Sequence, residues 1–250
     1  MLSEAELHRY SRHMLLREVG GVGQMRLGRA RVLVIGAGGL GAGALPYLAA
    51  AGIGHITVMD GDEVEVHNLQ RQVVHDTAHI GMNKALSAAA RMRAINPHVV
   101  VEAMPRHLTD EPDLVAAHDL ILDGTDSFAT RYLANDLAVR VSRPLISGAL
   151  TQWEGQIGLY ADAGSACLRC VFPEIPAEGL VPSCAEAGVL GPLPGIIGGM
   201  MAAEAVKRLA GAGTPLRNRL MIFDALYMET RVMTVHRRDD CPTCGNPAHR

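Results

Sequence analysis

The segment Gly36-Ala37-Gly38-Gly39-Leu40-Gly41 constrains the fold of this chain more than any other feature of its sequence. It matches the pattern G-x-G-x-x-G and directly follows Arg31-Val32-Leu33-Val34-Ile35, an apolar run typical of a buried parallel strand. A helix is expected to follow over residues 39–51. Glycines here allow a tight turn and a close approach of the backbone to phosphate, and the helix N-terminus favours negative charge. The segment therefore predicts a nucleotide site.

The alternation of strand and helix continues along the chain. Further strands are predicted at 56–60, 99–103, 120–122 and 145–147, and helices at 82–95, 109–117 and 127–141. This order predicts an α/β fold with a Rossmann-like, doubly wound, mostly parallel sheet. Strands at 157–161, 220–224 and 231–236, with a helix near 195–209, predict an antiparallel C-terminal extension of that sheet.

A chain of 250 residues can bury one large core, so we expect a single domain over 1–250. A helical arm is predicted over about 1–25, where a capping box at Ser3-Glu4-Ala5-Glu6 opens a helix to about Leu16 and the glycine-rich residues 20–23 lead into the first strand. The nucleotide-binding core covers about 30–150, and a C-terminal part that contains all five cysteines covers about 151–250.

Composition excludes several classes of protein. A hydrophobic fraction of 48% argues against disorder, and a net charge of −3 gives no bulk attraction for nucleic acid or membrane. The acidic N-terminus lacks the basic start of a signal peptide, and the most apolar C-terminal stretch, 193–206, is too short to span a bilayer. We expect a cytoplasmic protein that binds neither nucleic acid nor membrane.

Asp60 stands 19 residues after Gly41, at the end of the second predicted strand, where a carboxylate can accept hydrogen bonds from ribose hydroxyls. The glycine fingerprint normally suggests NAD. A helix N-terminus supplies only about half a positive charge, which suits a diphosphate but falls short of a triphosphate carrying about four negative charges. ATP would therefore need further cations.

The sequence offers such cations. Two of them are Arg71, in the segment Asn68-Leu69-Gln70-Arg71-Gln72, and Lys84. Asp126, just past the fourth strand, could hold Mg²⁺ together with phosphate oxygens. Each cation, considered alone, could also be an ordinary solvent-exposed charge on the surface. Their occurrence together favours a triphosphate site.

Four of the five cysteines form two C-x-x-C pairs, Cys167/Cys170 and Cys241/Cys244. Four thiolates in two such pairs are typical of tetrahedral structural zinc, and they leave no open position for catalysis. The alternative is redox chemistry by one of the pairs, but neither stands in a thioredoxin-like context. We predict a structural Zn²⁺ that ties the chain end to the domain.

Over nearly its full length the sequence resembles the MoeB/ThiF/HesA family of ubiquitin-activating-like adenylyltransferases. The resemblance is carried by an ordered set of segments. They are Arg9-Tyr10-Ser11-Arg12, the glycine segment, Asp60-Gly61-Asp62, Asn68-Leu69-Gln70-Arg71-Gln72, Gly81-Met82-Asn83-Lys84, Asp123-Gly124-Thr125-Asp126, Glu154-Gly155-Gln156, the two cysteine pairs and Ala187-Gly188-Val189-Leu190-Gly191-Pro192.

This resemblance implies roles for individual residues. Arg71 and Lys84 contact the phosphates of ATP, and Asp60 takes the ribose. Arg12 reaches the phosphates bound to a neighbouring subunit, which implies a homodimer with composite sites. The rest of the implied nucleotide set is Gly36, Gly38, Gly39, Gly41, Asp62, Asn68 and Gln72, with Asp126 and Ser127 near the Mg²⁺. The resemblance also supports one zinc ion held by all four paired cysteines.

The reaction implied is adenylylation of the C-terminal glycine of a ubiquitin-like sulfur-carrier protein with a Gly-Gly tail, with release of pyrophosphate. An α-carboxyl group has a pKa of roughly 3.5, so the nucleophile is already ionised and needs no general base. Catalysis is then positioning and charge neutralisation by Arg12, Arg71, Lys84 and Mg²⁺. A MoaD-like carrier would serve molybdopterin synthesis and a ThiS-like carrier thiamin synthesis, with sulfur from a separate donor.

Two other functions stay open on the sequence. An NAD-dependent oxidoreductase would explain the glycine segment and Asp60 but would leave Arg12, Arg71 and Lys84 without a role. A non-catalytic nucleotide-binding scaffold would keep the fold and the zinc without the chemistry.

Cys184 stands apart from the two pairs, in a long Pro/Gly-punctuated stretch. In ThiF-like relatives a cysteine here can link covalently to the carrier, whereas MoeB-like enzymes do without one; a small, partly buried apolar residue is the alternative. We predict ordinary surface or hydrogen-bonding roles for four of the histidines, His13, His67, His75 and His79.

Overall fold

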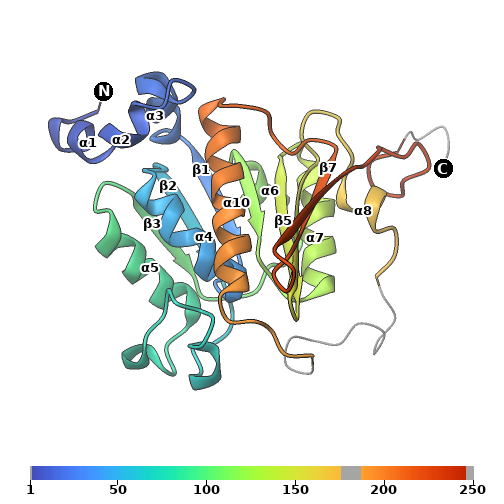
Figure 1. Ribbon diagram of the computed structural model, residues 1–250, viewed down its shortest axis with the longest axis horizontal. Coiled ribbons are helices and arrows are strands. Elements are labelled where there is room, and N and C mark those ends of the chain that lie inside the picture. Colours follow the sequence, from blue (N-terminus) through green and yellow to red (C-terminus); the bar gives the residue numbers. More distant parts are fainter. Residues whose placement is uncertain (1, 176–186, 246–250) are drawn as a thin grey trace.

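A computed structural model describes residues 2–175 and 187–245 of the chain (Figure 1). Its centre is one eight-stranded sheet with the order β3-β2-β1-β4-β5-β6-β7-β8. The strands are β1 (Arg31–Ile35), β2 (His55–Met59), β3 (Val100–Met104), β4 (Leu120–Asp123), β5 (Leu145–Thr151), β6 (Glu154–Tyr160), β7 (Arg219–Asp224) and β8 (Glu229–Thr234). Strands β1 to β5 pair in parallel and β5 to β8 pair antiparallel, which confirms the predicted doubly wound sheet and its extension.

Helices cover both faces of this sheet (Figure 1). The helices are α1 (Glu4–Arg9), α2 (Ser11–Met14), α3 (Gly20–Leu27), α4 (Gly39–Ala50), α5 (Lys84–Ile95), α6 (Pro112–Ala116), α7 (Phe128–Arg140), α8 (Leu168–Val171) and α10 (Leu193–Ala210), with 3-10 turns η1 (Val66–Asn68) and η2 (Thr77–His79). In the described part of the chain, none of them combines the length and apolar character needed to cross a bilayer.

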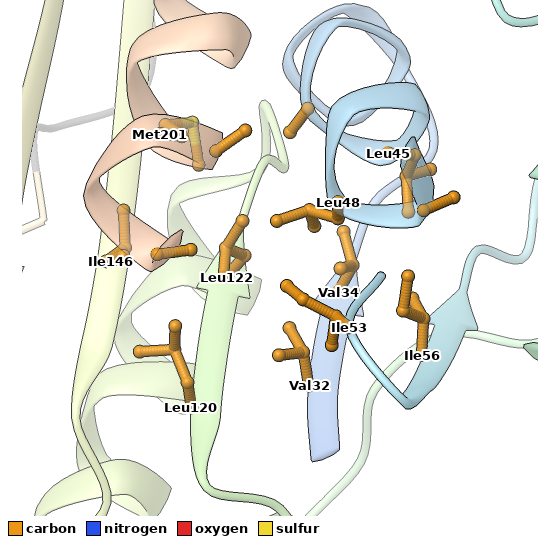
Figure 2. Close-up of a cluster of buried hydrophobic side chains, with 14 of the residues drawn as sticks. Val32, Val34, Leu45, Leu48, Ile53, Ile56, Leu120, Leu122, Ile146 and Met201 are labelled. Carbon is orange, nitrogen blue, oxygen red and sulfur yellow. The ribbon is translucent and has the colours of Figure 1, made fainter. Parts of the chain in front are cut away.

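The central strands are buried on both faces, and alternate residues serve the two faces. Val32 and Val34 pack with α4 and α10, in the cluster that also contains Leu48 and Met201 (Figure 2). Leu33 and Ile35 pack with α6 and α7 on the other side. Successive side chains of a strand point to opposite faces of the sheet. A strand in a parallel sheet covered by helices on both faces is therefore expected to be apolar at every position.

Helices α4 and α10 cross closely because glycines meet at the crossing. A Cβ on Gly43 would lie 2.5 Å from the Pro194 carbonyl oxygen, and Gly198 faces the backbone of Gly43 in the same way. A Cβ on Gly39 would lie 3.2 Å from Pro194 Cβ, so the first turn of α10 is held against the first turn of α4. This contact brings α10 to the edge of the glycine segment.

The N-terminal arm differs from the prediction in two ways. The capping box at Ser3 is confirmed, but the helix is interrupted at Tyr10. Tyr10 is buried, and its hydroxyl accepts a hydrogen bond from Asn96 Nδ2 at 2.8 Å. The glycine-rich residues 20–23 belong to helix α3 rather than to a connecting segment, since Gly23 packs against Ala210 of α10. Tertiary packing has overridden the low helix propensity of glycine.

Candidate functional site

A cavity of about 780 Å³ opens at the carboxyl ends of the parallel strands. It lies at β1 and β4, where the strand order reverses, the usual ligand position in a doubly wound sheet. Most of the predicted nucleotide set lines it: Gly36, Gly38, Gly39, Asp60, Asp62, Arg71, Gln72, Lys84, Asp126 and Ser127. Segments separated by more than 80 residues of sequence therefore meet at one site.

The glycines of the first turn are required by close backbone approaches. Gly36 has a φ of +93°, and a Cβ there would lie 3.1 Å from the Gly124 carbonyl that follows β4. Gly41 does not line the cavity, because it faces the Gly36 carbonyl from the first turn of α4. Gly36 and Gly41 thus shape the turn, while Gly38 and Gly39 form its open wall.

Asp60 is tied to this turn by both of its carboxylate oxygens. Oδ2 accepts the Ala37 N–H at 2.7 Å, and Oδ1 accepts the Asp62 N–H at 2.8 Å. Burial raises the pKa of Asp60, although both hydrogen bonds and the charge of Lys84 oppose that shift. Each oxygen keeps a further lone pair, so the predicted ribose contact is compatible with the geometry.

Lys84 is the first residue of α5, and Asn83 caps that helix by accepting the Ala85 N–H. The Lys84 side chain is largely buried, with 10% of it exposed, and its ammonium group lies 3.0 Å from Asp62 Oδ2. His107, which also lines the cavity, lies 3.7 Å from Asp62 Oδ1. The cation therefore faces the cavity next to the glycine turn.

Arg71 and Gln72 come from the segment after η1. Arg71 is half-buried and donates one hydrogen bond to the His67 carbonyl at 3.1 Å. Gln72 is buried, and within the described residues its Oε1 has no hydrogen-bond partner. Asn68 does not line the cavity. Its Oδ1 accepts the Glu65 N–H and closes the turn that precedes Arg71 and Gln72.

Asp126 and Ser127 lie at the start of α7. Ser127 is the N-cap residue, and its Oγ accepts the Thr130 N–H at 3.3 Å. The Asp126 carboxylate is exposed in the cavity, and no described residue donates to it or forms an ion pair with it. A carboxylate that opens into a cavity in this way is a type of oxygen ligand that a divalent cation can take.

Sequence reasoning missed the buried network beneath the cavity. Asp123, at the end of β4, is fully buried and accepts hydrogen bonds from Arg131 Nε at 3.2 Å and Ser147 Oγ at 2.7 Å. Arg131 also donates to the carbonyls of Thr125 and Gly148. The available signal was a carboxylate ending an apolar strand, with an arginine eight residues later on the following helix.

Two predicted residues lie elsewhere. Arg12 is exposed on α2 and is not among the residues that line the cavity, so its role depends on a second copy of the chain and stays a prediction. Cys184 lies outside the described residues.

The four paired cysteines meet at one point, although 74 residues separate Cys167 from Cys241. Their Sγ atoms lie within 4.8 Å of one another, with Cys167–Cys241 at 3.6 Å and Cys170–Cys244 at 3.4 Å. Tetrahedral zinc with Zn–S bonds of about 2.3 Å needs S–S separations of about 3.8 Å. Burial raises the pKa of the Cys167 thiol, so its thiolate form needs a nearby positive charge. A metal ion bound by all four cysteines would supply that charge.

The fold and the cavity define a doubly wound α/β protein with a glycine turn and facing cations at its switch point. Residues 10–243 match the ThiF family. The chain belongs to that family, and it is an adenylyltransferase.

Two curated relatives match almost end to end. The sulfur carrier protein adenylyltransferase of Thermus thermophilus is 49% identical over 98% of this chain and 93% of that protein. The SAMP-activating enzyme E1 of Haloferax volcanii is 46% identical over 98% of this chain and 91% of that protein. The probable adenylyltransferase/sulfurtransferase MoeZ of Mycobacterium tuberculosis is also 46% identical, but this chain spans only 63% of it.

Among solved structures, E. coli MccB with MccA-N7isoASN has a TM-score of 0.84 at 23% identity, over 98% of this chain and 76% of that chain. This likeness shows that the two chains share a fold.

Proposed function

We propose that this chain uses ATP and Mg²⁺ to adenylylate the C-terminal glycine of a ubiquitin-like sulfur-carrier protein, releasing pyrophosphate. The observation that carries the proposal is the pairing, in one cavity, of a glycine turn with the cations Lys84 and Arg71. A dinucleotide diphosphate does not need these cations, whereas a triphosphate does. The names of the two relatives matched almost end to end support a carrier as the acceptor. The oxidoreductase alternative has no such support.

The carrier carboxylate needs no general base, because an α-carboxyl group has a pKa of roughly 3.5 and is already ionised at neutral pH. Its attack on the α-phosphorus of ATP brings two anions together, and the departing pyrophosphate adds further negative charge. Lys84 and Arg71 would neutralise this charge, with Arg12 of a second copy completing the set. They act by position and charge and transfer no proton.

Asp126 and Ser127 would hold the Mg²⁺ at the start of α7. The exposed carboxylate of Asp126 supplies the hard oxygen ligand that Mg²⁺ prefers, and phosphate oxygens would supply others. The bound ion would reduce the negative charge of the triphosphate, which the carboxylate of the carrier must approach.

The cavity leaves a path for the carrier tail. Beyond the glycine turn it extends to Glu154 and Gln156 of β6 and to Ile222 of β7. The β7–β8 hairpin next to these strands exposes Tyr227 and Met228, which are 71% and 73% exposed. We place the body of the carrier on this hairpin and its Gly-Gly tail along β6, because a flexible glycine tail needs only a narrow channel while the globular part needs an apolar surface.

The test is ATP–pyrophosphate exchange with Mg²⁺, using a MoaD-like carrier and a ThiS-like carrier beside versions that lack the terminal Gly-Gly. Exchange with one carrier that vanishes with its truncated form would establish the acyl-adenylate and assign the chain to molybdopterin or thiamin synthesis. ATP binding without exchange in the presence of either carrier would contradict the proposal and favour the scaffold alternative.

Cys184 is not needed for adenylylation, so Cys184→Ser is expected to retain exchange. A carrier adduct that survives denaturation in the parent chain and is lost in Cys184→Ser would show that this cysteine links covalently to the carrier. Sulfur itself is proposed to come from a separate donor.

A further inference from the structure

His75 lies directly behind the glycine turn and does not line the cavity. It is buried, with 6% of the residue exposed. Its Nε2 lies 2.9 Å from the Ala37 carbonyl oxygen, and its Nδ1 lies 2.9 Å from Ser87 Oγ of α5. The ring is thus a hydrogen-bonding histidine, as one of the two predicted alternatives has it, and not a surface one. It joins the segment that carries it to the glycine turn and to α5.

The partners of the imidazole fix its tautomer. A carbonyl oxygen can only accept, so Nε2 carries the proton and Nδ1 accepts from the Ser87 hydroxyl. Burial lowers the pKa of His75, which keeps the ring neutral near pH 7. Ser87, itself buried, therefore orients a ring whose other nitrogen holds the Ala37 carbonyl.

Ala37 is fully buried, and both of its backbone groups are held. Its N–H donates to Asp60 Oδ2 at 2.7 Å, and its carbonyl accepts from His75. The bond between Ala37 and Gly38 is trans, so the Ala37 C=O and the Gly38 N–H lie in one plane and point in opposite directions. Because the carbonyl points back to His75, the Gly38 N–H points away from it.

Gly38 lines the cavity, and within residues 2–175 and 187–245 its N–H has no acceptor. Its carbonyl, in contrast, accepts the Ala42 N–H at 2.7 Å and starts α4. A backbone donor at a helix start that opens to a cavity is the arrangement by which such turns bind phosphate. The carbonyl of the same peptide unit is held by His75, which does not line the cavity.

We propose that His75 is a positioning residue that aims the Gly38 N–H at a phosphate of the bound nucleotide. The proposal rests on the proposed function in that it requires a nucleotide in this cavity. It predicts that His75 determines affinity for the phosphates and leaves affinity for the nucleoside unchanged.

The experiment measures dissociation constants for ATP and for adenosine by titration calorimetry, beside kcat and KM in the exchange reaction. His75→Phe keeps an aromatic ring but loses the donor, and we expect it to weaken ATP binding about tenfold with adenosine unchanged. His75→Gln places an amide donor where Nε2 lies and is expected to bind ATP within about threefold of the parent. Ser87→Ala is expected to fall between them.

His79→Phe is the matched control, since His79 lies on the same segment and contacts Asp76 instead of the glycine turn. Equal weakening of ATP and adenosine in His75→Phe, or no weakening of either, would overturn the proposal. Should His75→Phe not fold, the ratio of ATP to adenosine affinity in Ser87→Ala decides in the same way. A parent chain that binds ATP without exchange would contradict the proposed function alone, whereas one that does not bind ATP would overturn both.

Discussion

Lys84 and Asp62 are joined twice. The Lys84 ammonium lies 3.0 Å from Asp62 Oδ2, and the Lys84 backbone N–H donates to the Asp62 carbonyl at 2.8 Å. The side-chain contact holds the largely buried Lys84 against an Asp62 side chain that is 57% exposed. A phosphate entering the cavity can share the ammonium with Asp62.

Removing the cations should abolish turnover and spare the fold. We expect Lys84→Ala and Arg71→Ala each to lower kcat for pyrophosphate exchange by about 100-fold or more, because each removes charge stabilisation from the transition state. Arg91→Ala, on the exposed side of the same helix α5, is the control and should be unchanged. Near-normal exchange in both cavity variants would contradict the proposed role of these cations.

The carrier should respond to changes on the β7–β8 hairpin. Tyr227→Asp is expected to raise the KM for the carrier severalfold without changing the KM for ATP, because a charge replaces an exposed apolar contact. Val100→Asp, on the opposite edge strand β3 and 59% exposed, is the matched control. Equal effects of the two substitutions on carrier KM would rule out the hairpin as the docking surface.

The buried pair beneath the cavity should be costly to break. Asp123→Ala leaves the Arg131 guanidinium buried without its counter-charge, so the free energy of unfolding is expected to fall by about 3–5 kcal/mol. Asp110→Ala removes an exposed partner of Arg140 and should cost about 0–1 kcal/mol. Urea unfolding measures both, and similar losses in the two variants would argue against this difference.

The cysteine cluster should bind about one zinc ion per chain. Cys241→Ser removes one of four ligands, so we expect loss of zinc and a lower melting temperature, measured by elemental mass spectrometry and calorimetry. Cys184→Ser should keep its zinc, because Cys184 belongs to neither pair. Full zinc occupancy in Cys241→Ser would show that the four cysteines are not the ligand set.

Stability should decrease in mild acid. Burial lowers the pKa of His118 from 6.5, and its ring is held between Leu114 O at 2.8 Å and Thr57 Oγ1 at 2.9 Å. Below about pH 6.5 the unfolded chain takes up the proton before the folded chain does, so the free energy of unfolding falls as the pH drops, by up to about 1.4 kcal/mol per pH unit for this group.

Urea unfolding at several pH values from 7.5 downward measures this slope. His118→Gln should flatten it, whereas His8→Gln, at an exposed position, should leave it unchanged. An unchanged slope in His118→Gln would contradict the assignment.

Much of the fold followed from local patterns. The apolar run of β1, the glycine turn and α4 stand within one or two residues of their predicted bounds, because strand burial, turn geometry and helix entry each depend on neighbouring residues. The spacing of the two cysteine pairs likewise predicted a four-sulfur cluster.

Local sequence patterns were thus enough to predict the alternation of strands and helices, the glycine turn and the residue types of the expected ligands, because each of these depends on a short stretch of chain. Three features became known only from the folded chain: residues 20–23 are helical, the N-terminal helix is interrupted at Tyr10, and His75 is buried behind Ala37. The physical reason is that these features depend on contacts between distant segments, such as Tyr10 with Asn96, 86 residues apart. No local pattern specifies which distant atoms will meet.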